Sequence, residues 1–164
     1  MLLGFDAPIG VPRSYLQAAR RGSEGPSYGT FVEWLTDAAA KPGFFMETSD
    51  VDAWGVDRPF FRVPPGKGSR SRWERRLGGL GIKTLRDIDS STQAKPAFVV
   101  SGIPGSVGSA ARDVSQGLLA FLERECRLIA LWPFEGSLAE LAASGRVVVG
   151  EIYPRVAASG SSHH

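Results

Sequence analysis

The sequence predicts an α/β fold in which short apolar strands alternate with helices. Apolar runs typical of buried strands are followed by segments with the three-and-four spacing of amphipathic helices, and glycines and prolines separate them. The length of 164 residues corresponds to a single domain, and 43% hydrophobic with 22% charged residues is ordinary for a globular protein. The 20 glycines and 11 prolines exceed their usual share, which indicates many turns and irregular connections.

The N-terminal segment predicts one strand and two helices. The apolar run Leu2–Phe5 ends at Asp6 and is typical of a buried strand that enters a loop. A short helix is expected over residues 12–21, because a proline at the first helical position loses no hydrogen bond. A second helix is expected over residues 28–40, where four apolar side chains recur at the spacing of one buried face: Phe31, Trp34, Leu35 and Ala38.

Residues 43–90 show no periodic pattern. Prolines, glycines and the aromatic pairs Phe44-Phe45 and Phe60-Phe61 punctuate this stretch. We expect an irregular insertion held in place by its aromatic side chains, with one or two helical turns near residues 71–77. Irregular stretches of this length in a small domain are usually functional or mobile.

Regular structure is expected again after Pro96. Strands are predicted over 97–100, 127–132 and 146–153, and helices over 109–125 and 137–143. On the longer helix, four apolar side chains are expected to lie on one face: Val114, Leu118, Phe121 and Leu122. The single domain is therefore expected to span residues 1–158.

Residues 159–164 resemble a linker followed by the start of an affinity tag, and both histidines lie there. Without these two histidines, Ser-His and Cys-His catalysis are excluded. The single cysteine, Cys126, excludes a disulfide framework and a multi-cysteine zinc site, and we expect it to be a buried small side chain. No run approaches the ~18 apolar residues of a membrane span, and no signal-peptide core precedes Asp6, so we expect a cytoplasmic protein without membrane contact.

Two acidic residues follow apolar strands at opposite ends of the chain. Asp6 comes directly after the first predicted strand, and Glu151 lies near the end of the last one. If these strands are parallel neighbours, both carboxylates lie at the carboxyl edge of the sheet, where α/β folds bind ligands. Mg²⁺ or Mn²⁺ would neutralise them and support phosphodiester hydrolysis. Alternatively, Asp6 caps its loop and Glu151 pairs with an arginine, either Arg86 or Arg155.

The segment 62–86 is strongly basic, although the whole chain has a net charge of only +2. It contains Arg62, Lys67, Arg70, Arg72, Arg75, Arg76, Lys83 and Arg86, with Glu74 as its one acidic residue. Arginines beside an aromatic ring suit phosphate contacts and base stacking, so Arg70, Arg72, Trp73, Arg75, Arg76 and Arg86 are candidates for binding nucleic acid or another phosphate. The alternative is a solvated basic loop that pairs with the acids Glu47, Asp50, Asp52 and Asp57 upstream.

A glycine-rich loop lies between the strand predicted over 97–100 and the helix that follows. The backbone amides around Gly102, Gly105 and Gly108 could hold an anion at the helix N-terminus. The loop lacks the lysine and spacing of a phosphate-binding loop, and tight packing of strand against helix explains the glycines equally well. Two other features are expected to be structural: the aromatic strand exit Trp132–Phe134 as core, and Asp87 with Asp89 as a surface turn.

Five blocks of the chain together resemble an uncharacterised family of ribonuclease-H-like proteins, which are predicted nuclease relatives without an assigned substrate. The blocks are Gly4–Pro12, Arg58–Phe61, Phe98–Gly108, Leu131–Gly136 and Glu151–Pro154. They cover most of the chain, in the family's order. The resemblance implies a mixed sheet flanked by helices, with acidic residues around a divalent metal. Asp6 would match the acid after the central strand, and Glu151 the acid of the last strand.

The chain departs from this family at both ends. Ribonuclease-H-like folds begin with a three-stranded antiparallel meander that carries the leading metal-binding aspartate, and this chain is expected to start after it. Relatives continue into a final helix with a further acid, whereas only residues 155–158 precede the tag-like tail. We therefore expect a fragment or a mis-assigned start. A reduced core would leave a sheet edge unpaired, which favours a homodimer formed through that edge.

Three functions follow as hypotheses from the sequence. The first is a divalent-metal-dependent phosphodiesterase or nuclease relative in which Asp6 and Glu151 are the catalytic metal ligands. The second is a non-catalytic domain that binds nucleic acid or a phosphorylated small molecule through the arginines of 62–86. The third is a truncated domain that has neither activity.

Overall fold

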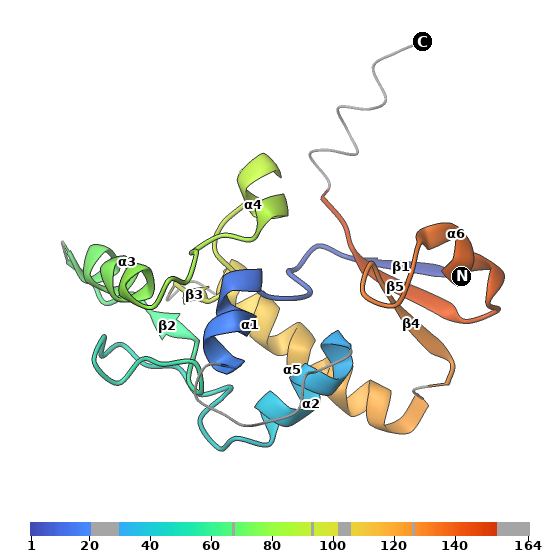
Figure 1. The fold of residues 1–164 in the computed structure, drawn as a ribbon, viewed down its shortest axis with the longest axis horizontal. Helices are drawn as coiled ribbons and strands as arrows, with labels where there is room; N and C mark the ends of the chain where they lie inside the picture. The colour runs from blue at the N-terminus through green and yellow to red at the C-terminus, as the bar shows by residue number, and fades with distance from the viewer. Residues whose placement is uncertain (21–29, 67, 93, 102–105, 126, 154–164) are drawn as a thin grey trace, which may run out of the picture.

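The computed structural model confirms an α/β fold and describes residues 1–20, 30–66, 68–92, 94–101, 106–125 and 127–153 (Figure 1). Six helices are found in these residues: α1 (Arg13–Arg20), α2 (Phe31–Ala39), α3 (Ser69–Gly79), α4 (Asp87–Thr92), α5 (Val107–Glu125) and α6 (Leu138–Ala143). The strands there are β1 (Leu2–Phe5), β2 (Phe61–Arg62), β3 (Val99–Val100), β4 (Ile129–Trp132) and β5 (Val147–Glu151). The element order matches the predicted alternation, and cysteine 126 and the tail lie outside the described residues.

The strands form two small parallel sheets. The larger has the order β1-β5-β4, and the smaller pairs β2 with β3. In Figure 1 the larger sheet lies with α6 on one side of the molecule and the smaller lies near α3 on the other, with α1, α2 and α5 between them. The resemblance implies a mixed sheet, but the named strands of the described residues pair only in parallel.

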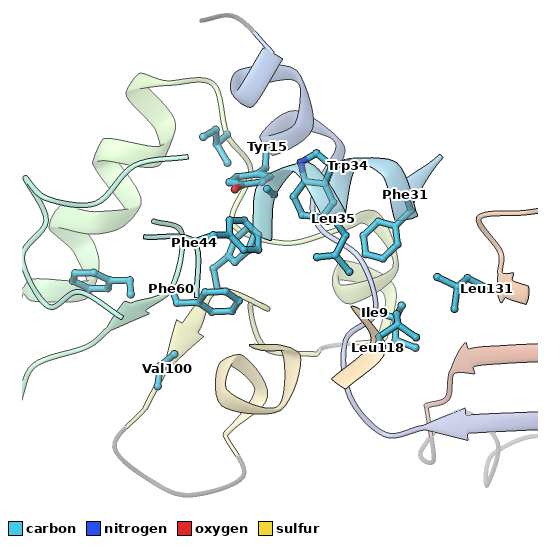
Figure 2. Close-up of a cluster of buried hydrophobic side chains, with 14 of the residues drawn as sticks. Ile9, Tyr15, Phe31, Trp34, Leu35, Phe44, Phe60, Val100, Leu118 and Leu131 are labelled. Atoms are coloured by element: carbon cyan, nitrogen blue, oxygen red, sulfur yellow. The ribbon is translucent and has the colours of Figure 1, made fainter. Parts of the chain in front are cut away.

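The predicted buried face of α2 is confirmed, since all four of its apolar side chains are buried. Thr30 begins this helix with a capping box, in which its side chain accepts from the amide of Glu33 and the Glu33 carboxylate accepts from the amide of Thr30. The helix packs into an aromatic cluster with Tyr15, Phe44 and Phe60 (Figure 2). The Tyr15 hydroxyl donates to the carbonyl of Val56 at 2.6 Å. This cluster joins the N-terminal helices to residues 43–90.

The prediction of an irregular insertion over 43–90 is only partly right. Its aromatic side chains do anchor it, because Phe44, Trp54, Phe60 and Phe61 are buried. However, the segment contains β2, α3 and α4, and β2 pairs with β3. Only two residues of the 11-residue helix α3 are buried, and this is too few to produce a recognisable apolar period in the sequence.

The edge strand β1 is more exposed than the sequence indicates. Leu2, Leu3 and Phe5 are exposed, which contradicts the prediction of a buried strand. Phe121 of α5 is exposed as well. Leu3, Phe5 and Phe121 line an apolar groove of about 560 Å³ between β1 and α5. An apolar, unpaired sheet edge of this kind is open to edge pairing. A homodimer through this edge stays a prediction.

No helix within the described residues is both long enough and apolar enough to cross a membrane.

Gly108 allows α5 to approach β3 closely. A Cβ atom on Gly108 would overlap the carbonyl group of Val99, so a larger residue forces the backbone of one element to move. The substitution Gly108→Ala is therefore expected to lower the free energy of unfolding by about 1–3 kcal/mol, measured by urea denaturation.

Gly117→Ala is the matched control, because Gly117 lies in the same helix with no atom near the position of its Cβ. The free energy of unfolding of this variant is expected to rise by about 0.5–1 kcal/mol, since alanine has a higher helix propensity than glycine. Equal effects of the two substitutions would contradict the close approach of α5 to β3.

Candidate functional site

A pocket of about 370 Å³ lies at the carboxyl ends of the three parallel strands β1, β5 and β4. We call it the sheet-edge pocket. Its lining residues are Ile9, Gly10, Val11, Arg86, Ile88, Trp132, Pro133, Phe134, Glu151 and Tyr153. Phe5 and Glu151 are register partners in β1 and β5, so the predicted parallel neighbours are present. The pocket therefore occupies the place at which open α/β sheets bind ligands.

Arg86 is the centre of a buried polar network at this pocket. Its side chain is 9% exposed and pairs with Asp89 at 2.6 Å and with Glu151 at 2.6 Å. Asp89 is 0% exposed, and its second oxygen also accepts from the backbone amide of Arg86 at 3.0 Å. The pairing of Glu151 with Arg86, one of the predicted alternatives, is therefore present, and arginine 155 lies outside the described residues.

All five N–H groups of the Arg86 side chain have acceptors. The Nε atom donates to Asp89, Nη1 to the carbonyl of Ile9 and to Glu151, and Nη2 to Asp89 and to Glu151. The hydroxyl of Tyr153 is a further acceptor at 3.2 Å from Nη2. The network therefore links the loop after β1, the start of α4 and the end of β5, three segments that are far apart in the sequence.

The surroundings of Arg86 and Tyr153 shift the pKa of each side chain in this network. Burial lowers the pKa of Arg86, but the hydrogen bonds and charges of Glu151 and Asp89 outweigh this effect, so the pKa is raised above its ordinary value. Burial raises the pKa of Tyr153, and the hydrogen bond with Glu151 raises it further. At neutral pH the guanidinium is therefore charged and the phenol is protonated, so neither group exchanges a proton there.

The donor set at the sheet edge does not fit a divalent cation. Both oxygens of Glu151 accept from Arg86, and Oε2 also accepts from the amide of Ile9 at 3.1 Å. Asp6 is exposed and follows β1 directly. Within the described residues no three acidic, histidine or cysteine side chains gather into a group that could hold a metal. Arg86 engages both oxygens of Glu151, so neither oxygen is left free to hold a metal ion.

A second candidate site lies on α3. Four of the seven described cations of the segment 62–86 have acidic partners: Arg62 pairs with Glu47, Arg70 with Glu74, Lys83 with Asp87, and Arg86 with Asp89 and Glu151. The pairing of Arg62 with Glu47 agrees with the alternative in which upstream acidic residues form ion pairs with the basic segment. Lysine 67 lies outside the described residues.

Three arginines of α3 are not paired in this way. Within the described residues Arg72, Arg75 and Arg76 form no ion pair. They are exposed and line a shallow hollow of about 420 Å³ together with Val51 and Asp52. Arg76 is held in place, because its Nε donates to the carbonyl of Trp54 at 3.2 Å. We call these three side chains the arginine face.

Two of the residues predicted to contact phosphate or bases are buried. Trp73 is 1% exposed and stacks on Phe61, with ring centroids 5.5 Å apart and planes at 5°, so no nucleobase reaches its ring. Arg86 has no free donor and is buried. Arg70 is exposed, but its charge is balanced by Glu74 at 2.8 Å. Three of the six candidates therefore remain unpaired and exposed.

The glycine-rich loop is described only at its end. Glycines 102 and 105 of the predicted anion loop lie outside the described residues, and nothing about them is tested. Gly108 lies in the first turn of α5 against Val99, which agrees with the packing explanation for this glycine.

Sequence reasoning missed three residues of the sheet-edge pocket and its network. Asp89 is buried rather than part of a surface turn. Trp132 packs against the core, as predicted, and also lines the pocket. Phe134 lines the pocket and is 37% exposed rather than buried in the core. The one available signal was the spacing of Arg86 and Asp89, three residues apart at the start of a short helix, where the two side chains meet.

Comparisons with protein-family models, with curated proteins and with solved structures found no match for this chain. The fold and the two sites define its class: an α/β protein with a pocket at the carboxyl edge of a parallel sheet and a separate arginine face. Membership of a ribonuclease-H-like family stays a prediction.

Proposed function

We propose that this protein binds nucleic acid through phosphate contacts made by Arg72, Arg75 and Arg76. The observation that carries the proposal is the absence of an acidic partner for these three side chains, within the described residues, while the other described cations of the same segment are paired. Guanidinium groups match phosphate oxygens in geometry and charge.

The arrangement of the arginine face supports contact with several phosphates. Residues 72, 75 and 76 are three and four apart, so their side chains share one face of α3. Asp52 is the one acidic residue lining the same hollow, and three positive charges against one negative charge leave a net charge of +2 there. A shallow, positively charged hollow suits a nucleic-acid backbone, because successive phosphates of a strand can lie along the surface of the protein.

The salt dependence of oligonucleotide binding tests this proposal. Bound phosphates release counterions, so the logarithm of the affinity falls with the logarithm of salt concentration by about 0.7 per contact for a single strand. Replacing Arg72, Arg75 and Arg76 together with glutamine is expected to reduce this slope by about 2, measured by fluorescence anisotropy with a labelled oligothymidylate.

The matched control removes the same charge elsewhere. Arg13, Arg124 and Arg127 are exposed and lie outside α3, and their replacement with glutamine is expected to leave the slope nearly unchanged. An equal loss of slope in both triple variants would show a general charge effect and contradict the arginine face. Inhibition by inorganic phosphate as strong as inhibition by the oligonucleotide would identify a small phosphorylated ligand instead.

A metal-dependent nuclease of the ribonuclease-H-like class is the second candidate function. The parallel pairing of β1 with β5 supports it, because this pairing brings Asp6 and Glu151 to one sheet edge. The nuclease is the weaker candidate, because Arg86 already engages both oxygens of Glu151.

Calorimetric titration of Mn²⁺ into the protein, with the tail histidines removed, tests the metal site. We expect no saturable binding that depends on Asp6 and Glu151, because both oxygens of Glu151 already accept hydrogen bonds from Arg86. Binding to the wild type that is lost in both Asp6→Asn and Glu151→Gln would contradict this expectation and favour the nuclease.

A further inference from the structure

The sheet-edge pocket has walls that are mostly apolar and include three aromatic rings. Trp132, Phe134 and Tyr153 contribute these rings, and Ile9, Val11, Ile88 and Pro133 complete the apolar lining. A volume of about 370 Å³ is in the range of pockets that enclose small molecules. The pocket is separate from the arginine face, with which it shares no lining residue.

Two of the aromatic walls are held in fixed positions by glycines. Gly10 has a φ of +105°, and a Cβ atom there would lie 2.7 Å from the Phe134 ring. A Cβ atom on Gly150 would lie 3.1 Å from the Trp132 ring. Phe134 also stacks on Phe31 with ring centroids 4.4 Å apart. The rings are therefore packed in place before any ligand enters, which lowers the entropy lost on binding.

The charge of the pocket disfavours an anion. Every N–H group of Arg86 already has an acceptor, so this cation has no donor left for a carboxylate or a phosphate. Asp89 is fully buried and does not line the pocket, but it shares Arg86 with the lining residue Glu151. The network of these three residues has two negative charges against one positive charge, a net charge of −1.

We propose that the sheet-edge pocket binds a small organic cation with an apolar body, such as an alkylated ammonium group. The faces of aromatic rings attract cations, and the excess carboxylate charge adds to this attraction. The apolar lining accepts the alkyl or aryl part of the same molecule. This proposal uses residues different from those of the arginine face, so either one can fail without the other.

Three probes of similar size and different charge test the proposal on the full chain by calorimetry. They are benzyltrimethylammonium, benzyl alcohol and benzoate. The cation is expected to bind about tenfold more tightly than either the neutral or the anionic probe. In an amide and indole NMR spectrum of the wild type, the signals of Gly10 and Trp132 are expected to shift during the titration.

The variant Phe134→Leu keeps an apolar wall and removes one ring. It is expected to reduce the preference for the cation several-fold, whereas Phe121→Leu, at an exposed ring of α5 outside the pocket, leaves that preference unchanged. Benzoate binding as tightly as the cation, no saturation by the cation at about 10 mM, or an unchanged preference in a folded Phe134→Leu variant would each overturn the proposal. If the Phe134→Leu variant does not fold, the proposal is tested by the affinities of the three probes and by the NMR shifts of the wild type.

Discussion

Replacing Arg86 with methionine is expected to lower the free energy of unfolding by about 3–5 kcal/mol, measured by urea denaturation. The substitution removes the counter-charge of Asp89, which is 0% exposed, and of Glu151, whose side chain is 14% exposed. Two carboxylates then remain at the sheet edge without a partner, and a buried charge without a partner is costly. The hydrogen bond to the carbonyl of Ile9 is also lost.

Lys83→Met is the control for this experiment. Lys83 and Asp87 form a pair in the same part of the chain, but their side chains are 72% and 90% exposed and 3.5 Å apart. Loss of this exposed ion pair is expected to lower the free energy of unfolding by less than about 0.5 kcal/mol. A similar small cost for Arg86→Met would mean that the network does not hold the three segments together. The double variant Arg86→Met with Glu151→Gln is expected to lose less than the sum of the single losses, because the two residues are in contact.

Replacing Trp73 with alanine is expected to lower the free energy of unfolding by about 3–5 kcal/mol. The indole is 1% exposed, stacks on Phe61 and lies against Trp54 with ring centroids 6.2 Å apart. Its removal leaves a cavity between α3 and the small sheet. The measurement is thermal or urea unfolding of the variant beside the wild type.

Trp73→Phe separates the packing role of Trp73 from a role in binding. The indole Nε1 atom is buried and has no hydrogen-bond partner within the described residues, so phenylalanine removes an unsatisfied donor and keeps an aromatic ring. This variant is expected to lose less stability than Trp73→Ala and to bind an oligonucleotide as the wild type does. A large loss of affinity in a stable Trp73→Phe protein would restore the base-stacking role.

Local patterns in the sequence were sufficient to predict most helices and strands. The buried face of α2 follows from apolar residues at helical spacing, and this spacing is a property of the chain itself. The parallel order of β1 and β5 agrees with the expectation that Asp6 and Glu151 lie at one edge. By contrast, the sequence predicts only one or two turns where α3 is found. Trp73 and Leu77 of this helix are buried against residues outside it, such as Phe61 and Trp54, and local spacing does not reveal such contacts.

The roles of the charged residues could not be derived from local patterns. Arg72 and Arg86 have the same chemistry and lie in the same basic segment, yet one is exposed without an ion pair in the described residues and the other is buried between two carboxylates. Which arginine is neutralised depends on acids that are near in space, such as Glu151, which is 65 residues away from Arg86.

The sequence by itself determined the α/β class, the order of the elements outside residues 43–90 and the clustering of basic residues in one segment, because these depend on composition and on the spacing of neighbouring residues. Only the tertiary structure decided which cations remain available for a ligand and which aromatic rings line a pocket. Arg86 meets Ile9 and Glu151, and Phe134 meets Gly10 and Phe31, only after the chain has folded. Burial and charge pairing are properties of these distant contacts, and no short stretch of the chain contains them.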